Sequence, residues 1–129
     1  MNHTTAADRR AELDGLSNRF VEAFNRQDLE AIMSFFAVDA VYEDPYGKRH
    51  EGLEEIRTQF EVVVGGNLGK ISFDGEDRFI DEDTGKVMDS WMLRMWIGDE
   101  AKEERKMRGL DLLHWEGDRL IRKITYKQD

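Results

Sequence analysis

The sequence predicts an α+β fold in which three N-terminal helices pack on a curved antiparallel β-sheet. In the first half of the chain, apolar residues recur at three- and four-residue steps, which is the spacing of helices with one buried face. The second half alternates strand-like segments with short turns that contain glycine. Short connections join antiparallel neighbours, and helices segregated from antiparallel strands are typical of α+β domains.

Each helix is expected from its apolar stripe and its boundaries. The stripe of the first helix consists of Leu13, Leu16, Phe20, Ala23 and Phe24. Asp28 is a favourable N-cap for a second, short helix from Leu29 to about Phe36. A third helix is expected from about Leu53 to Val64, and the glycine-rich segment 65–69 ends it.

The strands follow from short apolar segments between turns. A strand from Ala40 to Glu43 is expected to end at Asp44, because the residue before Pro45 is held in an extended conformation; Tyr46-Gly47-Lys48 then forms a turn. The second half is expected to contain strands at Ile71–Phe73, Arg78–Ile80, Val87–Ile97, Glu104–Trp115 and Arg119–Tyr126. Hairpin turns are expected at 83–86 and 116–118, where glycine permits a positive φ.

Length and composition favour a single domain spanning residues 1–129. A chain of 129 residues builds one core, and its net charge of −9 argues against nucleic acid and anionic membranes as partners. The absence of cysteine excludes disulfides and a thiol nucleophile. Residues 1–10 are polar, unlike a signal peptide, and no apolar stretch approaches the ~20 residues of a membrane span, so a cytoplasmic location is expected.

Two acidic residues are the candidates for chemistry. Asp44 stands at the end of a predicted strand, and Asp111 interrupts the apolar run from Leu110 to Trp115. An apolar pocket that holds two acids drives their pKa values apart, so that one accepts a proton while the other donates one. This pairing predicts an acid–base enzyme.

The order of elements resembles the cone-shaped fold of the nuclear transport factor 2-like (NTF2-like) superfamily. The resemblance extends from about Leu13 to Tyr126 and is carried by the segments 20–25 and 43–47, the latter followed by Gly52. Within the superfamily, the chain is most similar to ketosteroid isomerases and SnoaL-like polyketide cyclases. The superfamily also includes dehydratases, epoxide hydrolases and proteins without catalytic activity, so the fold does not select one reaction.

The resemblance to ketosteroid isomerase assigns roles to both acids. It implies that Asp44 is the general base, and that Asp111, four residues before Trp115, stays neutral and donates a hydrogen bond to the substrate oxygen. The family's catalytic tyrosine aligns with Phe20, and its two supporting tyrosines align with Phe36 and Phe60, so all three hydroxyl groups are missing. Tyr42 is a candidate replacement, because it shares a strand face with Asp44.

The expected site is a deep apolar pocket for a small hydrophobic molecule that bears a carbonyl group, with no cofactor. The lining is expected to comprise Phe20, Phe24, Phe36, Tyr42, Phe60, Leu113 and Trp115. Epoxide hydrolysis, cyclisation of a polyketide and ligand binding without turnover are the alternative functions. The purely structural alternatives are that Asp44 only opens a turn and that Asp111 pairs with Arg105 or Arg122 on a neighbouring strand.

Two further expectations concern partners and metals. One predicted strand has apolar residues at consecutive as well as alternate positions, so both of its faces would be apolar: Trp91, Met92, Leu93, Met95 and Trp96. This pattern predicts a strand with one face in the cavity and the other against a second subunit, and therefore a homodimer. His3, His50 and His114 lack the spacing of metal ligands, so no metal site is expected, and His114 should face away from Asp111.

Overall fold

The computed structural model describes residues 5–66, 68–97 and 103–128, which form three helices and one six-stranded sheet. The helices are α1 (Ala6–Asn25), α2 (Leu29–Ser34) and α3 (Leu53–Val64). The strands are β1 (Phe36–Glu43), β2 (Arg49–Glu51), β3 (Lys70–Asp81), β4 (Lys86–Ile97), β5 (Glu103–Glu116) and β6 (Arg119–Gln128). None of the described helices has the length and hydropathy needed to cross a membrane.

The sheet confirms the antiparallel meander but is not antiparallel throughout. Its strand order is β2-β1-β6-β5-β4-β3, and the four strands from β3 to β6 pair as successive antiparallel neighbours. β1 pairs with β6 in parallel, with Tyr42 opposite Lys123. The prediction of a purely antiparallel sheet is therefore wrong at this pair. Turn residues specify only strands adjacent in sequence, whereas β1 and β6 are brought together by tertiary packing.

Several predicted boundaries also differ from the structure. The second helix ends at Ser34 rather than near Phe36, which instead begins β1. The two short strands predicted at 71–73 and 78–80 form one strand, β3, with an irregularity between Gly75 and Asp77 that keeps both ends paired with β4. The sequence reasoning missed β2, whose three residues pair with the end of β1.

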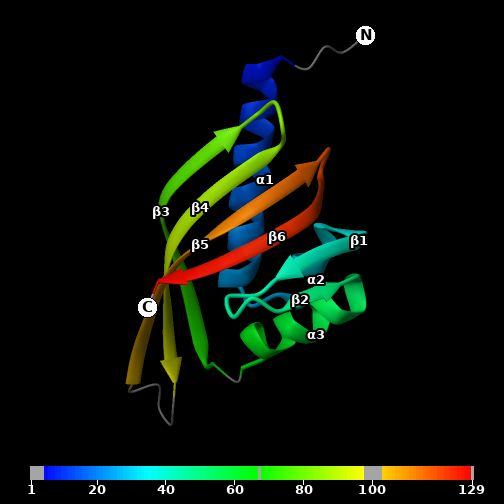
Figure 1. Cartoon of the computed structure of the whole chain (residues 1–129). Helices are drawn as coiled ribbons and strands as arrows, with labels where there is room; N and C mark the ends of the chain where they lie inside the picture. The colour runs from blue at the N-terminus through cyan, green and yellow to red at the C-terminus, as the bar shows by residue number, and fades with distance from the viewer. Residues whose placement is uncertain (1–4, 67, 98–102, 129) are drawn as a thin grey trace.

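The helices cover one face of the curved sheet (Figure 1). α1 passes behind the sheet in this view, while α2 and α3 lie beside β1 and β2. Alternation along β4 directs Val87, Asp89, Trp91 and Leu93 into the interior, where they are buried. The apolar ones, Val87, Trp91 and Leu93, join a core that is rich in aromatic side chains.

A buried ion pair connects α1 to the sheet. The Asp89 side chain is 8% exposed and accepts hydrogen bonds from two nitrogens of the Arg78 guanidinium group. Arg78 Nη1 also donates to the backbone and side-chain oxygens of Asp14 and to Asn18 Oδ1. A buried carboxylate is costly unless it is paired, so Arg78 both neutralises Asp89 and holds α1 against β3 and β4.

Candidate active site

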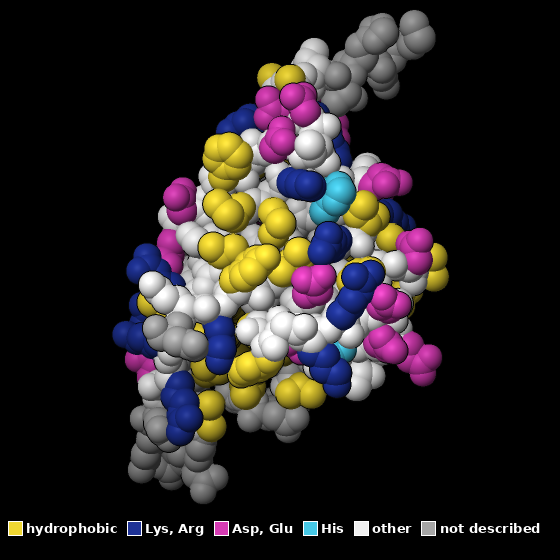
Figure 2. Space-filling model, viewed as in Figure 1, with side chains coloured by type: hydrophobic (Ala, Val, Ile, Leu, Met, Phe, Trp, Pro, Cys, Tyr) yellow, Lys and Arg dark blue, Asp and Glu magenta, His cyan; other side chains and the backbone are white. Residues whose placement is uncertain are grey.

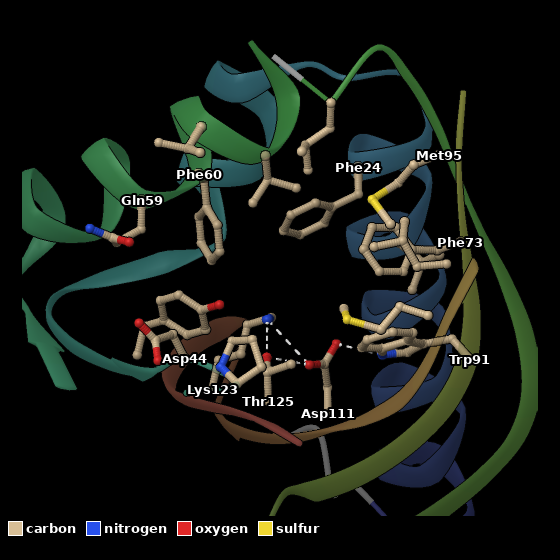
Figure 3. A pocket seen from close by; sticks show the side chains of 18 of the residues that line it. Phe24, Asp44, Gln59, Phe60, Phe73, Trp91, Met95, Asp111, Lys123 and Thr125 are labelled. Carbon is tan, nitrogen blue, oxygen red and sulfur yellow. Dashed lines mark hydrogen bonds and ion pairs between the residues drawn. The ribbon is translucent and has the colours of Figure 1, made fainter. Parts of the chain in front are cut away.

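A cavity of about 450 Å³ lies between the helices and the inner face of the sheet (Figure 3). Its walls are mostly apolar and include Phe24, Phe60, Phe73, Trp91 and Met95. The polar side chains that reach it include Asp44 from the turn after β1, Asp111 from β5, and Lys123 and Thr125 from β6. An apolar cavity of this size with a few convergent polar groups is the usual form of a small-molecule site.

Five of the seven predicted lining residues border this cavity, namely Phe20, Phe24, Tyr42, Phe60 and Leu113. Phe36 and Trp115 are not among the residues that line it. Phe36 lies behind Phe60, with ring centroids 5.6 Å apart, and Trp115 packs against Phe20 at 6.2 Å. Both are buried core residues. Their expected place in the lining is therefore corrected: they support the aromatic wall from behind.

Asp44 is held in place by the turn that joins β1 to β2. Its Oδ1 accepts hydrogen bonds from the backbone N–H groups of Tyr46 and Lys48, both at 2.9 Å. Its Oδ2 lies 3.0 Å from His50 Nε2. Gly47 has a φ of 84°, which the turn requires and which glycine adopts without strain. Asp44 thus both opens a turn and lines the cavity. The two roles considered from the sequence, as a turn residue and as a pocket residue, do not exclude each other.

The surroundings of Asp44 keep its carboxyl group ionised. Burial acts to raise the pKa of Asp44, but the hydrogen bonds from His50 and from the Lys48 and Tyr46 backbone outweigh burial and lower it overall. The ionised state is the one that a general base requires, and it is maintained although the side chain is only 12% exposed. Because an ionised carboxylate only accepts hydrogen bonds, we assign the proton on His50 to Nε2.

Asp111 lies on the inner face of β5 and is surrounded by donors. Its Oδ1 accepts from Thr125 Oγ1 at 2.6 Å and lies 3.2 Å from Lys123 Nζ, and its Oδ2 accepts from Trp91 Nε1 at 3.1 Å. Ammonium and indole N–H groups only donate. Lys123 also donates to Thr125 Oγ1 at 2.7 Å, which leaves the hydroxyl hydrogen of Thr125 for Asp111. These contacts favour Asp111 as an acceptor rather than the neutral donor that the resemblance implies.

Lys123 is the partner of Asp111, in place of the Arg105 or Arg122 considered from the sequence. Arg122 instead contacts Glu43 at 2.9 Å. The Lys123 side chain is 6% exposed. Its Nζ lies 4.5 Å from the ring centroid of Tyr42, 5.4 Å from that of Phe60 and 5.8 Å from that of Phe24. A cation over aromatic faces is stabilised by the ring quadrupoles.

The sequence reasoning missed both Lys123 and His50 as site residues. Lys123 and Thr125 are two residues apart on β6, so their side chains lie on the same face of the strand, towards the cavity. The charged Arg122 beside Lys123 makes this alternation of inward and outward residues hard to recognise in the sequence. His50 is buried and stands opposite Tyr42 in the pairing of β1 with β2, where the two rings stack at 5.7 Å. His50 could have been found only by recognising β2, and that strand is too short to show an alternating pattern in the sequence.

Tyr42, the proposed replacement for the missing tyrosines, also reaches the cavity. Burial raises the pKa of its hydroxyl group, and the charge of Lys123 opposes this only in part. The hydroxyl group therefore stays protonated at neutral pH. Across residues 5–66, 68–97 and 103–128, no three His, Asp or Glu side chains are grouped as metal ligands.

Comparison with known proteins gives the same fold and a family. The model of the SnoaL-like domain family matches residues 18–123. An NTF2-like protein of unknown function from Mesorhizobium loti is 21% identical, with 95% of each chain covered and a TM-score of 0.75. A putative polyketide cyclase from Xanthomonas campestris pv. campestris is 16% identical, with 93% of each chain covered and a TM-score of 0.79.

A third solved structure is that of SalBIII, described as an epoxide hydrolase/cyclase-like enzyme in pyran ring formation in the polyether salinomycin. It is 18% identical, with 92% of each chain covered and a TM-score of 0.80. At these identities the solved structures establish the shared fold, and the family match covers most of the chain. The chain belongs to the SnoaL-like domain family and has the NTF2-like fold.

Proposed function

We propose that the chain is an enzyme that uses acid–base chemistry to open an epoxide or close a ring in a mainly apolar, oxygen-bearing small molecule. The observation that carries the proposal is that Asp44 and Lys123 reach one apolar cavity. An ionised carboxylate and a buried ammonium group offer a proton acceptor and a proton donor to the same bound molecule. The names polyketide cyclase and epoxide hydrolase/cyclase-like enzyme among proteins of the same fold support the choice.

The two groups divide the chemistry between them. Asp44 accepts a proton from a water molecule or from a hydroxyl group of the substrate. The oxygen so activated forms a bond to an epoxide carbon, and the C–O bond at that carbon breaks. Lys123 donates a proton to the oxygen that leaves. Exchange of protons with solvent returns both groups to their starting states.

The hydrogen bonds at Asp44 favour this chemistry over the ketosteroid isomerase reaction. They lower the pKa of Asp44 and so make it a weaker base. A weak base suits a hydroxyl nucleophile, because that proton becomes acidic as the new bond forms. Abstraction of a proton from carbon requires a stronger base. The isomerase reaction also needs a neutral donor, whereas Asp111 is positioned as an acceptor.

The test is turnover of a panel of hydrophobic epoxides, with and without an internal hydroxyl group. Liquid chromatography with mass spectrometry separates the diol from the cyclic ether. We expect Asp44→Asn and Lys123→Met each to lower the rate by about 10²- to 10³-fold, as loss of one electrostatic catalytic group does. Glu43→Gln is the matched control, because Glu43 adjoins Asp44 in sequence but pairs with Arg122. It should keep the wild-type rate.

A second assay, run in parallel with the epoxide panel, distinguishes the alternative functions. Conversion of a β,γ-unsaturated ketosteroid to its conjugated enone, followed by ultraviolet absorbance, tests the isomerase reaction with the same variants. Asp44-dependent enone formation without epoxide opening would replace our proposal by the isomerase. Saturable binding of these compounds with no turnover in either assay would identify a ligand-binding domain.

We also propose that the protein forms a homodimer through the sheet face that the helices leave uncovered. Figure 2 shows hydrophobic side chains gathered over the strands on this face. Phe79 is 65% exposed, Met88 44% and Tyr126 52%. Phe79 pairs with Met88, and Met88 pairs with Leu112, so the patch continues across three neighbouring strands. A contiguous exposed apolar patch of this kind marks a contact surface.

A further inference from the structure

We propose that Lys123 is a covalent site: its amine condenses with an aldehyde or ketone group of a hydrophobic ligand to form an imine. This goes beyond the proposed function, because it requires the cavity and Lys123 but neither turnover nor Asp44. The ligand class is an apolar carbonyl compound small enough for a cavity of about 450 Å³.

The Lys123 nitrogen lies in the apolar cavity and is shielded from solvent. Lys123 is one of seven lysines in the sequence, and its side chain is 6% exposed. Its Nζ lies within 6 Å of three aromatic ring centroids at the floor of the cavity. In Figure 3, Lys123 and Thr125 lie between the two acids and below Phe60 and Phe24. The nitrogen therefore faces a ligand that the apolar walls hold, and it acts as a nucleophile once it has lost a proton.

Asp111 provides a proton acceptor that stays in place beside Lys123. Asp111 Oδ1 lies 3.2 Å from Lys123 Nζ and is close enough to take its proton. Hydrogen bonds from Trp91 Nε1 and Thr125 Oγ1 hold the Asp111 carboxylate independently of Lys123. The carboxylate therefore keeps its position when the nitrogen changes from ammonium to amine and then to imine.

Lys123, Asp111 and the carbonyl group of the ligand supply every proton and electron pair that the reaction needs. After Lys123 gives a proton to Asp111, the nitrogen lone pair forms a C–N bond to the carbonyl carbon, and the carbonyl oxygen receives the displaced electron pair. That oxygen takes up the proton held by Asp111. A second proton, lost from the nitrogen, converts the hydroxyl group into leaving water as the C=N bond forms. The products are one water molecule and one protonated imine, which keeps the third proton of the original ammonium group and remains paired with the Asp111 carboxylate.

The test is borohydride trapping with 2-naphthaldehyde as the probe. The aldehyde and sodium borohydride are added to the folded protein, because reduction fixes an imine as a stable secondary amine. Peptide mass mapping then gives the labelling rate at each lysine. We expect Lys123 to be labelled at least about tenfold faster than Lys48 or Lys86, both exposed and therefore matched internal controls. Excess 2-naphthylmethanol, which has the same ring system but forms no imine, should compete for the cavity and slow labelling at Lys123 alone.

The variants separate this proposal from the proposed function. Lys123→Arg should remove the fast labelling, and Asp111→Asn should slow it. Asp44→Asn should leave Lys123 the fastest-labelled lysine although it lowers the rate of epoxide opening by about 10²- to 10³-fold. The labelling rates of the lysines in the wild-type protein test the covalent site even if a variant fails to fold. Labelling of Lys123 no faster than Lys48, or insensitive to 2-naphthylmethanol, overturns the covalent site and leaves the acid–base proposal standing.

Discussion

His50 Nε2 lies 3.0 Å from Asp44 Oδ2, with both side chains largely shielded from solvent. The pair forms because β1 and β2 fold back on each other, so that residues six apart in sequence meet beside the cavity. The imidazole donates to one carboxylate oxygen, and backbone N–H groups occupy the other. Asp44 is thereby oriented, kept ionised and weakened as a base.

Replacing Asp44 by asparagine should destabilise the fold in a pH-dependent way. A carboxyl group whose pKa is lower in the folded chain stabilises it above the unfolded-state value, about 3.9. That contribution disappears as the pH falls through the lower folded value. We expect Asp44→Asn to cost on the order of 1–3 kcal/mol at pH 7. The difference in the free energy of unfolding between wild type and Asp44→Asn should stay constant from pH 7 to 5 and become smaller below about pH 4.

Urea unfolding at each pH measures this effect. Asp39→Asn, at an exposed acid of the same strand, is the control and should change the free energy of unfolding by less than about 0.5 kcal/mol. A gap between wild type and Asp44→Asn that widens towards low pH would contradict the assigned direction of the shift.

The pair of Lys123 and Asp111 should show strong coupling in a double-mutant cycle. Lys123→Met leaves Asp111 buried without its cation, which should cost roughly 3–5 kcal/mol. Asp111→Asn added to Lys123→Met removes the unpaired charge, and its amide oxygen can still accept a hydrogen bond from Trp91 or Thr125, so it should recover much of the loss. Chemical denaturation of the four proteins gives the coupling energy. Additive losses would show that the two groups do not interact.

Arg78 should be among the residues whose removal most weakens the packing of α1 on the sheet. Arg78→Ala leaves Asp89 buried and unpaired, and we expect a loss of roughly 3 kcal/mol. Arg94→Ala is the matched control, because Arg94 also contacts two acids but is 38% exposed. Its loss should stay below about 1 kcal/mol. Thermal and urea unfolding provide the comparison, and equal losses would refute the special role of Arg78.

A charge placed on the uncovered sheet face should separate the proposed dimer. Light scattering after size-exclusion chromatography should give twice the chain mass for the wild-type protein. Met88→Asp should give the mass of one chain, because burying an unpaired carboxylate at the contact is costly. Val62→Asp, at an exposed valine of α3, is the control and should leave the mass unchanged. A wild-type protein of single-chain mass at all concentrations would exclude the dimer.

Local patterns in the sequence determined most of the fold. The three- and four-residue spacing on the helices and the glycine-containing turns were sufficient for three helices and the four-strand meander, because both depend on residues near one another in the chain. The same reasoning predicted two strands in place of β3, because the segment Asp74–Asp77 resembles a turn. In the structure, the pairing of β3 with β4 continues on both sides of the irregularity in this segment. It also extended α2 to Phe36, whose burial suits either a helix or a strand.

The sequence by itself also pointed to Asp44 and Asp111 as two acids beside one cavity, Asp44 chiefly through the resemblance to ketosteroid isomerase, and both residues line the cavity. What surrounds each acid was decided only by the tertiary structure. The parallel pairing of β1 with β6 puts Tyr42 opposite Lys123, and the β5–β6 register puts Asp111 opposite Thr125. The charge that a buried carboxyl group carries depends on the donors around it, and here those donors come from strands far apart in the sequence.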